Sequence, residues 1–166
     1  MITYTEKGAG LHEAITKAGH WLREADGQWI SSNDAAVQAI IDGYTLADAK
    51  AARIQQVLAH AKALRDKVVA AVSPGEMSCW AIKRAEAVQF RATGDAAQCP
   101  VLSLEAQHRQ VTLDTLVSKV EANATRLSSV EAVIGGVDGR HRDAIASLTT
   151  FEAVAAYNFN TGWPEV

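Results

Sequence analysis

Histidine and cysteine are the side chains with which this chain could bind a metal or attack a substrate. None of its histidines stands in HExxH or another recognised ligand spacing; they are His12, His20, His60, His108 and His141. Cys79 and Cys99 form no CxxC pair, and a reducing cytoplasm disfavours a disulfide between them, although one is possible in principle. We interpret both as small buried side chains and predict no metal and no cofactor.

The sequence also contains no recognised motif for acid–base catalysis, nucleophilic catalysis or phosphate binding. No two carboxylates are placed to face each other across a cleft, and neither a GxSxG elbow nor a Walker loop occurs. Glu86 stands beside Lys83 and Arg84 at helical spacing, which indicates a solvated ion pair. The segment Gly135-Gly136-Val137-Asp138-Gly139-Arg140 lacks the Lys-Ser/Thr of a phosphate loop, so we interpret it as a turn between helices. The sequence therefore indicates a protein that is not an enzyme.

The composition indicates an ordinary folded protein. The chain has 166 residues, 48% hydrophobic and 21% charged, which suffices for one domain with a core or for two small ones. Its net charge is −3 and its lysines and arginines are spread along the chain, so we expect no nucleic-acid binding. We also expect no signal peptide and no membrane insertion, because no apolar run approaches the roughly 20 residues that cross a bilayer.

The first 45 residues mix strand and helix signals. Residues 2–5 alternate like a strand, and residues 11–18 place apolar side chains on one helical face. Asp26-Gly27 between two short β-like runs is typical of a type I′ hairpin turn. A helix capped by Ser32 or Asn33 then ends at Gly43. These signals predict a small β-α-β-β-α docking module over residues 1–45.

Residues 46–166 predict a mainly α-helical bundle with two long amphipathic helices, which makes the fold class α+β. The first long helix covers residues 54–71, and a helix over residues 76–92 follows the break at Pro74-Gly75. A shorter helix follows Pro100, and a last one holds Ile145 to Val154 after Gly139. On the helix over residues 76–92 we expect the inward side chains to be Trp80, Ala81, Ala85, Val88 and Phe90.

The second long helix covers residues 113–137, with Thr112 as its cap and Gly135-Gly136 as its end. Asn123 is the polar member of its stripe. A buried Asn at such a seam fixes register or oligomer number, whereas an Asn at the rim of a bundle within one chain does neither. The stripe steps by three and four residues: Leu113, Leu116, Val120, Asn123, Leu127, Val130, Ile134 and Val137.

Aromatic and basic residues supply the other candidate partner-binding positions. A module of 45 residues rarely buries two tryptophans by itself, so Trp21 or Trp29 is expected to face the helical part or another chain. Arg140 and Arg142 fall near the start of the expected last helix, where positive charge is slightly unfavourable without an acidic partner. Trp163 belongs to an aromatic tail that is either a lid on the bundle or a contact for a partner.

Three stretches of the sequence carry a resemblance to known proteins. The first is residues 2–8 (ITYTEKG) with the hairpin from Trp21 to Trp29. The second is residues 63–67 (ALRDK) leading to residues 80–87 (WAIKRAEA), and the third is residues 141–145 (HRDAI) with the closing Gly162-Trp163-Pro164. Together they resemble a family of small tail proteins encoded by tailed phages and prophages. The latter two are similar to a helical domain of unknown function at the C-termini of tail-fibre-associated proteins.

The resemblance implies a protein at the distal end of a phage tail, made in the host cytoplasm. The favoured role is a virion structural component that connects or organises tail fibres or receptor-binding proteins at the baseplate. Its expected partners are tail-fibre or baseplate proteins and, as a homo-oligomer, further copies of itself. The alternative is a tail-fibre assembly chaperone that binds the fibre tip during trimer formation. A small cytoplasmic enzyme is the third hypothesis, which the missing catalytic constellation disfavours.

Overall fold

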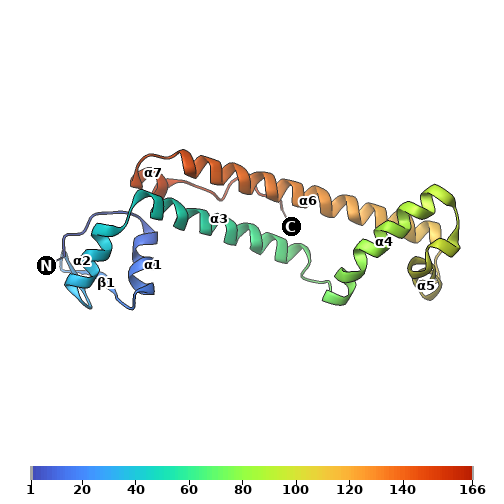
Figure 1. Cartoon of the computed structure of the whole chain (residues 1–166), viewed down its shortest axis with the longest axis horizontal. Helices are drawn as coiled ribbons and strands as arrows, with labels where there is room; N and C mark the ends of the chain where they lie inside the picture. Colours follow the sequence, from blue (N-terminus) through green and yellow to red (C-terminus); the bar gives the residue numbers. More distant parts are fainter. Residues whose placement is uncertain (1, 166) are drawn as a thin grey trace. The chain divides into compact units, whose positions relative to one another are not determined.

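The computed structural model describes residues 2–165 and is dominated by helices (Figure 1). The expected α+β class is confirmed, with a two-stranded antiparallel sheet as the β part. In chain order the elements are α1 (Ala9–Lys17), β1 (Leu22–Ala25), β2 (Gln28–Ser31), α2 (Asp34–Gly43), α3 (Leu46–Val68), α4 (Pro74–Thr93), the 3-10 helix η1 (Ala96–Gln98), α5 (Pro100–Arg109), α6 (Leu113–Ser147) and α7 (Phe151–Ala156).

The described residues form two compact units. Unit 1 contains residues 2–63 and 135–163, and unit 2 contains residues 64–134 and 164–165. Helices α3 and α6 therefore contribute residues to both units. The boundary that the sequence predicts at residue 45 falls inside unit 1.

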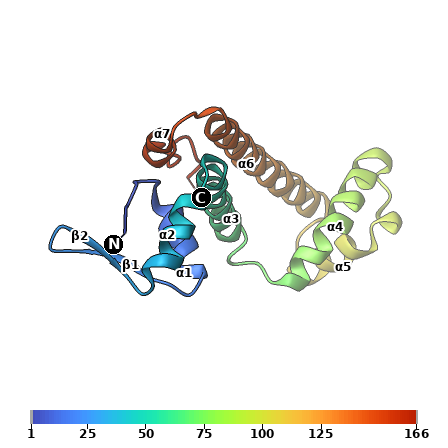
Figure 2. The same ribbon diagram turned by 60° about the vertical axis from the view of Figure 1, so that its left-hand side comes forward.

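The predicted hairpin is present in unit 1 (Figure 2). Ala25 pairs with Gln28 and Leu22 with Ser31, so two residues, Asp26 and Gly27, make the turn. Both have positive φ, 50° and 73°, which is the type I′ geometry that matches the twist of the strands. The helix after the hairpin is also confirmed, because the Asn33 carboxamide oxygen accepts the amide hydrogen of Ala36 at 3.1 Å.

The strand predicted at residues 2–5 is wrong. The Thr3 amide donates to the Gln38 side-chain oxygen at 2.8 Å, and the Gln38 side-chain nitrogen donates to the Thr3 carbonyl at 3.2 Å. A side chain on α2 thus satisfies backbone groups that a strand partner would otherwise satisfy. Ile2 is nevertheless buried, and the described part of unit 1 begins with a segment that is neither helix nor strand, followed by α1, the hairpin and α2.

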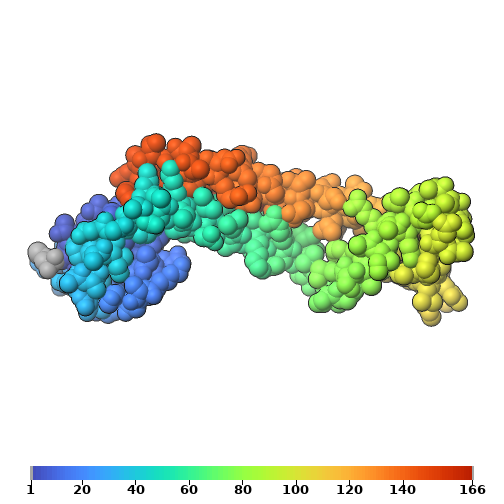
Figure 3. All heavy atoms as spheres, in the orientation of Figure 1, coloured from blue at the N-terminus to red at the C-terminus, as the bar shows by residue number. Residues whose placement is uncertain are grey.

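The core of unit 1 joins residues from both ends of the chain. Figure 1 shows the C-terminal part of α6 alongside α3, and in Figure 3 the orange-red atoms lie against the cyan atoms of α3. The Lys50 ammonium donates to the Ala146 carbonyl at 2.7 Å across this contact. The main apolar cluster consists of Ile2, Leu11, Ile15, Val37, Ile41, Tyr44, Ala49 and Val154.

Helix α6 does not end at Gly135-Gly136 as the sequence predicts. It continues to Ser147 through both glycines and Gly139, and α7 begins only at Phe151. A glycine in a helix costs about 1 kcal/mol relative to alanine, whereas burying one large aliphatic side chain contributes about 1.5–3 kcal/mol. Val137 and Ile145 beyond the glycines are both buried, so packing outweighs the glycine penalty.

The inward face predicted for α4 is only partly right, since Trp80 and Phe90 are half-buried and Phe90 packs against the apolar cluster of unit 2. Val88 is 63% exposed and Ala81 and Ala85 are exposed, whereas Glu86 and Ala87 are buried. Hydrophobic spacing misplaces this face because a carboxylate occupies part of it.

Glu86 is not a solvated ion pair but a cap for α5. Its two carboxylate oxygens accept the amide hydrogens of Val101 at 3.2 Å and Leu102 at 2.8 Å, where the N-cap residue Cys99 supplies no side-chain acceptor. The Cys99 thiol donates to the Glu86 carbonyl at 3.2 Å.

Both cysteines are free. Cys99 is buried as predicted, whereas Cys79 is only half-buried. Burial raises the pKa of the Cys99 thiol.

Replacing Glu86 with Ala removes the acceptor of two amide groups in unit 2. We expect the free energy of unfolding, measured by urea titration with circular dichroism, to fall by about 2 kcal/mol. The control is Glu76→Ala on the same helix, where an exposed first-turn carboxylate contributes less than about 1 kcal/mol. Equal losses in the two variants would contradict the capping role of Glu86.

Replacing Gly135 with Ala should raise the free energy of unfolding by about 0.5–1 kcal/mol, because alanine is the better helix former. Among the described residues, no atom outside the local helix lies within 4 Å of the added methyl group. At Gly10, by contrast, a methyl group would lie 2.6 Å from the Ala52 methyl and against the Tyr44 hydroxyl, so Gly10→Ala should destabilise the fold. A lower melting temperature for Gly135→Ala would show that the helix propensity of residue 135 does not limit the stability of the fold.

Candidate functional site

Trp21 is the most exposed aromatic side chain of the hairpin region. Its backbone is fixed, because its amide donates to the Ser32 hydroxyl and its carbonyl accepts the Ser32 amide hydrogen. Its indole is 47% exposed and carries the Arg23 guanidinium at 5.2 Å from the ring centroid. The backbone of Trp21 is therefore fixed, while its indole ring and the Arg23 guanidinium face solvent.

Trp29, the other tryptophan of the hairpin, belongs to the fold. Its ring stacks on Tyr4 with centroids 4.0 Å apart and packs against the apolar cluster of unit 1. The Tyr4 hydroxyl lies 3.1 Å from the His12 ring nitrogen, and burial followed by the Glu6 charge raises the pKa of Tyr4 to about 12. The sequence could not separate the two tryptophans, because the Tyr4 stack joins residues far apart in the chain.

The aromatic tail packs onto unit 1 as a lid. The Trp163 indole nitrogen donates to the Phe159 carbonyl at 2.6 Å, and its ring lies 4.9 Å from that of His60. Arg140 donates to the Thr161 carbonyl at 3.1 Å and thereby holds the tail. Arg142 pairs with Asp138 one turn earlier on α6, at 3.1 Å. Neither arginine lies at a helix N-terminus, in contrast to the prediction, because α6 continues past both.

His141 is a buried residue that the sequence did not distinguish. One ring nitrogen, Nε2, lies 2.9 Å from the Thr161 carbonyl oxygen, and the other, Nδ1, lies 2.8 Å from the Tyr157 hydroxyl. Because a carbonyl only accepts, Nε2 carries a hydrogen toward Thr161, and Nδ1 shares a hydrogen bond with the Tyr157 hydroxyl. Both nitrogens are used to fix the tail, which gives His141 a structural role.

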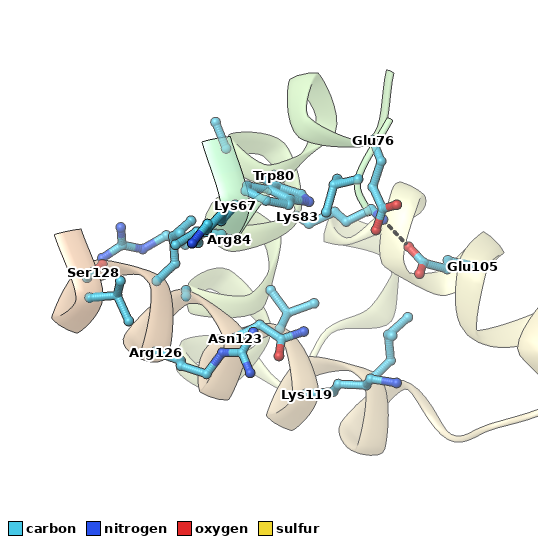
Figure 4. A pocket seen from close by; sticks show the side chains of 18 of the residues that line it. Lys67, Glu76, Trp80, Lys83, Arg84, Glu105, Lys119, Asn123, Arg126 and Ser128 are labelled. Atoms are coloured by element: carbon cyan, nitrogen blue, oxygen red, sulfur yellow. Dashed lines mark ion pairs between the residues drawn. The ribbon is translucent and has the colours of Figure 1, made fainter. Parts of the chain in front are cut away.

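Asn123 lines an open hollow in unit 2, which we call the unit 2 hollow; its volume is about 770 Å³. Figure 3 shows it between the green atoms that follow α3 and the orange atoms of α6, and Figure 4 shows Trp80 of α4 across it from Asn123. Asn123 is exposed, as expected for a rim position within one chain. Six of the apolar lining residues are half-buried: Val68, Val72, Trp80, Val120, Leu127 and Val130.

Basic side chains outnumber acidic ones around the unit 2 hollow. Glu105 accepts ion pairs from Lys83 at 2.7 Å, drawn as a dashed line in Figure 4, and from Arg109 at 2.8 Å. Glu76 and Glu165 are the other acidic lining residues. Within residues 2–165, no ion pair engages four further basic lining residues: Lys67, Arg84, Lys119 and Arg126.

The geometry defines a helix-dominated α+β protein with an exposed tryptophan on a hairpin and an apolar hollow edged by cations. In the part of the chain that the structure describes, His, Cys, Asp and Glu form no group of three or more that could hold a metal ion. None of the helices within residues 2–165 combines the length and apolar character needed to cross a bilayer. The chain matches no protein-family model, no curated protein and no solved structure.

Replacing Trp29 with Ala should lower the free energy of unfolding by about 3 kcal/mol, since the stack with Tyr4 and the core contact are both lost. Replacing Trp21 with Ala should change it by less than about 0.5 kcal/mol, because the indole faces solvent. Urea unfolding of the two variants measures this difference. A large loss for Trp21→Ala would assign Trp21 to the fold and remove it as a binding candidate.

Proposed function

We propose that this chain is a non-enzymatic structural protein of a phage virion, located at the tail tip, where it connects tail fibres or receptor-binding proteins at the baseplate. The resemblance of three sequence stretches to phage tail proteins supports the location. The surfaces of the two units support the connecting role. Trp21 lies in unit 1 and the hollow in unit 2, so the chain offers two separate contact surfaces.

The exposed Trp21 is the observation that carries the connecting role. Tryptophan and arginine are enriched among the residues that dominate binding energy at interfaces, and here an arginine stacks on the exposed indole. Covering the remaining exposed half of the ring removes about 100 Å² of mostly apolar area, which contributes about 2 kcal/mol, or about 30-fold in Kd. The hairpin is rigidly paired, so little conformational entropy is lost when a partner covers the ring.

Under this proposal the hairpin of unit 1 docks on a fibre or baseplate protein. Copies of the chain then occupy equivalent positions around the tail, in a number set by the tail symmetry. An assembly chaperone would use the same indole during fibre folding but would leave the finished particle.

Quantitative mass spectrometry of purified virions tests the proposal. We expect the chain in a fixed ratio to the major tail-tip proteins, and virions complemented with Trp21→Ala should carry it about 30-fold less efficiently at limiting expression. The control, Lys17→Ala, changes a side chain that is exposed on α1 and should be incorporated normally. Absence from virions together with abundance in infected-cell lysate would identify an assembly factor and overturn the structural role.

A further inference from the structure

The apolar stripe of α6 is covered at both ends in unit 2 but not in its middle. Leu116 and Val117 are buried near the start, and Ile134 is buried farther along. Between them Val120, Leu127 and Val130 are only half-buried, and Asn123 is exposed. The helix is therefore only partly covered over the segment that lines the unit 2 hollow.

The dimensions of the uncovered segment fit a short helix. From Val120 to Val130 the α6 axis advances by about 15 Å, which corresponds to about three turns of an α-helix. The facing wall consists of Val68, Val72 and Trp80, all half-buried. Apolar side chains on both walls with open access between them suit the apolar face of an amphipathic helix.

The charges at the edge of the hollow indicate which charge the polar side chains of a bound helix should carry. Lys67, Arg84, Lys119 and Arg126 belong to three different helices and have no ion-pair partner within residues 2–165. Glu105, by contrast, is already paired twice. Because the chain as a whole has net charge −3, this concentration of free cations is local. Carboxylates of a bound segment complement it.

We propose that the unit 2 hollow binds an acidic amphipathic helix of a partner protein. The apolar face of the helix packs between Trp80 and Leu127, and its carboxylates pair with basic residues such as Arg84 and Arg126. A nucleic acid fits less well, because the lining is aliphatic apart from Trp80 and so offers a single aromatic ring for base stacking. This inference goes beyond the tail role, since it concerns the other unit and specifies the chemistry of a second partner.

A designed peptide tests the proposal on the full chain. The probe is a fluorescein-labelled helix of about 16 residues with leucine at helical spacing and glutamate elsewhere, and the matched peptide carries lysine in place of glutamate. Fluorescence anisotropy should show saturable binding of the acidic peptide and at least about tenfold weaker binding of the basic one. Raising the salt from about 50 to about 500 mM should weaken the acidic complex without abolishing it, because the apolar contact is not screened.

Variants locate the binding. The double variant Arg84→Glu/Arg126→Glu should bind the acidic peptide at least about tenfold more weakly, and Lys17→Glu in unit 1, a matched charge reversal, should bind within about twofold of the unchanged chain. Circular dichroism confirms that each variant is folded. A second double variant, Arg84→Gln/Arg126→Gln, should give an intermediate loss if the charge-reversed protein does not fold.

Four outcomes would overturn the proposal. Equal binding of the two peptides would show that charge does not select the ligand, and unchanged binding by the Arg84/Arg126 variants would place it elsewhere. A single-stranded oligonucleotide that binds tighter than the acidic peptide and displaces it would assign the hollow to nucleic acid. A dimer in sedimentation that dissociates in the charge variants would assign the surface to a second copy of the chain. These binding measurements do not depend on whether the protein is present in virions. The tail-tip proposal and the helix-binding proposal can therefore fail independently.

Discussion

Burial of one stripe along α6 is the constraint on which most of this structure depends. The stripe outweighs the conformational cost of three glycines and keeps the helix intact to Ser147. Continuity then places Arg140 and His141 on a helix in unit 1, where they hold the carbonyl group of Thr161 and the hydroxyl group of Tyr157. Residues 157–163 pack by these side-chain bonds rather than by secondary structure of their own.

The unit 2 hollow follows from the way α4 uses its buried face. Glu86 and Ala87 face the start of α5, where the carboxylate satisfies two amide groups that have no other side-chain acceptor. This half of α4 is thereby committed to α5 and the beginning of α6. The first half, with Trp80, covers the middle of α6 only partly. A hydrogen-bonding requirement at one helix end thus determines where apolar surface stays open.

Features controlled by neighbouring residues could be predicted from the sequence, and features controlled by distant ones could not. Asp26-Gly27 defines its turn and Asn33 its helix start, since each acts within three residues. The failure at residues 2–5 depends on Gln38, and the burial of Glu86 in place of Ala85 and Val88 on α4 depends on amide groups of α5. The candidate site divides in the same way. The sequence indicated that one of the two hairpin tryptophans faces outward and left Asn123 open between a buried seam and a rim. The core position of Trp29 depends on Tyr4, and the unpaired cations of the hollow come together only in three dimensions.

The discontinuous composition of unit 1 has a consequence for synthesis on the ribosome. Unit 2 consists almost entirely of one uninterrupted stretch, residues 64–134, so its contacts become available while translation continues. Unit 1 also needs residues 135–163, which are synthesised only after some seventy intervening residues have followed its part of α3. The earliest-made part of the chain is therefore the last to complete its core. Its unfinished apolar surface is exposed to chaperones for longer than that of the segment made after it.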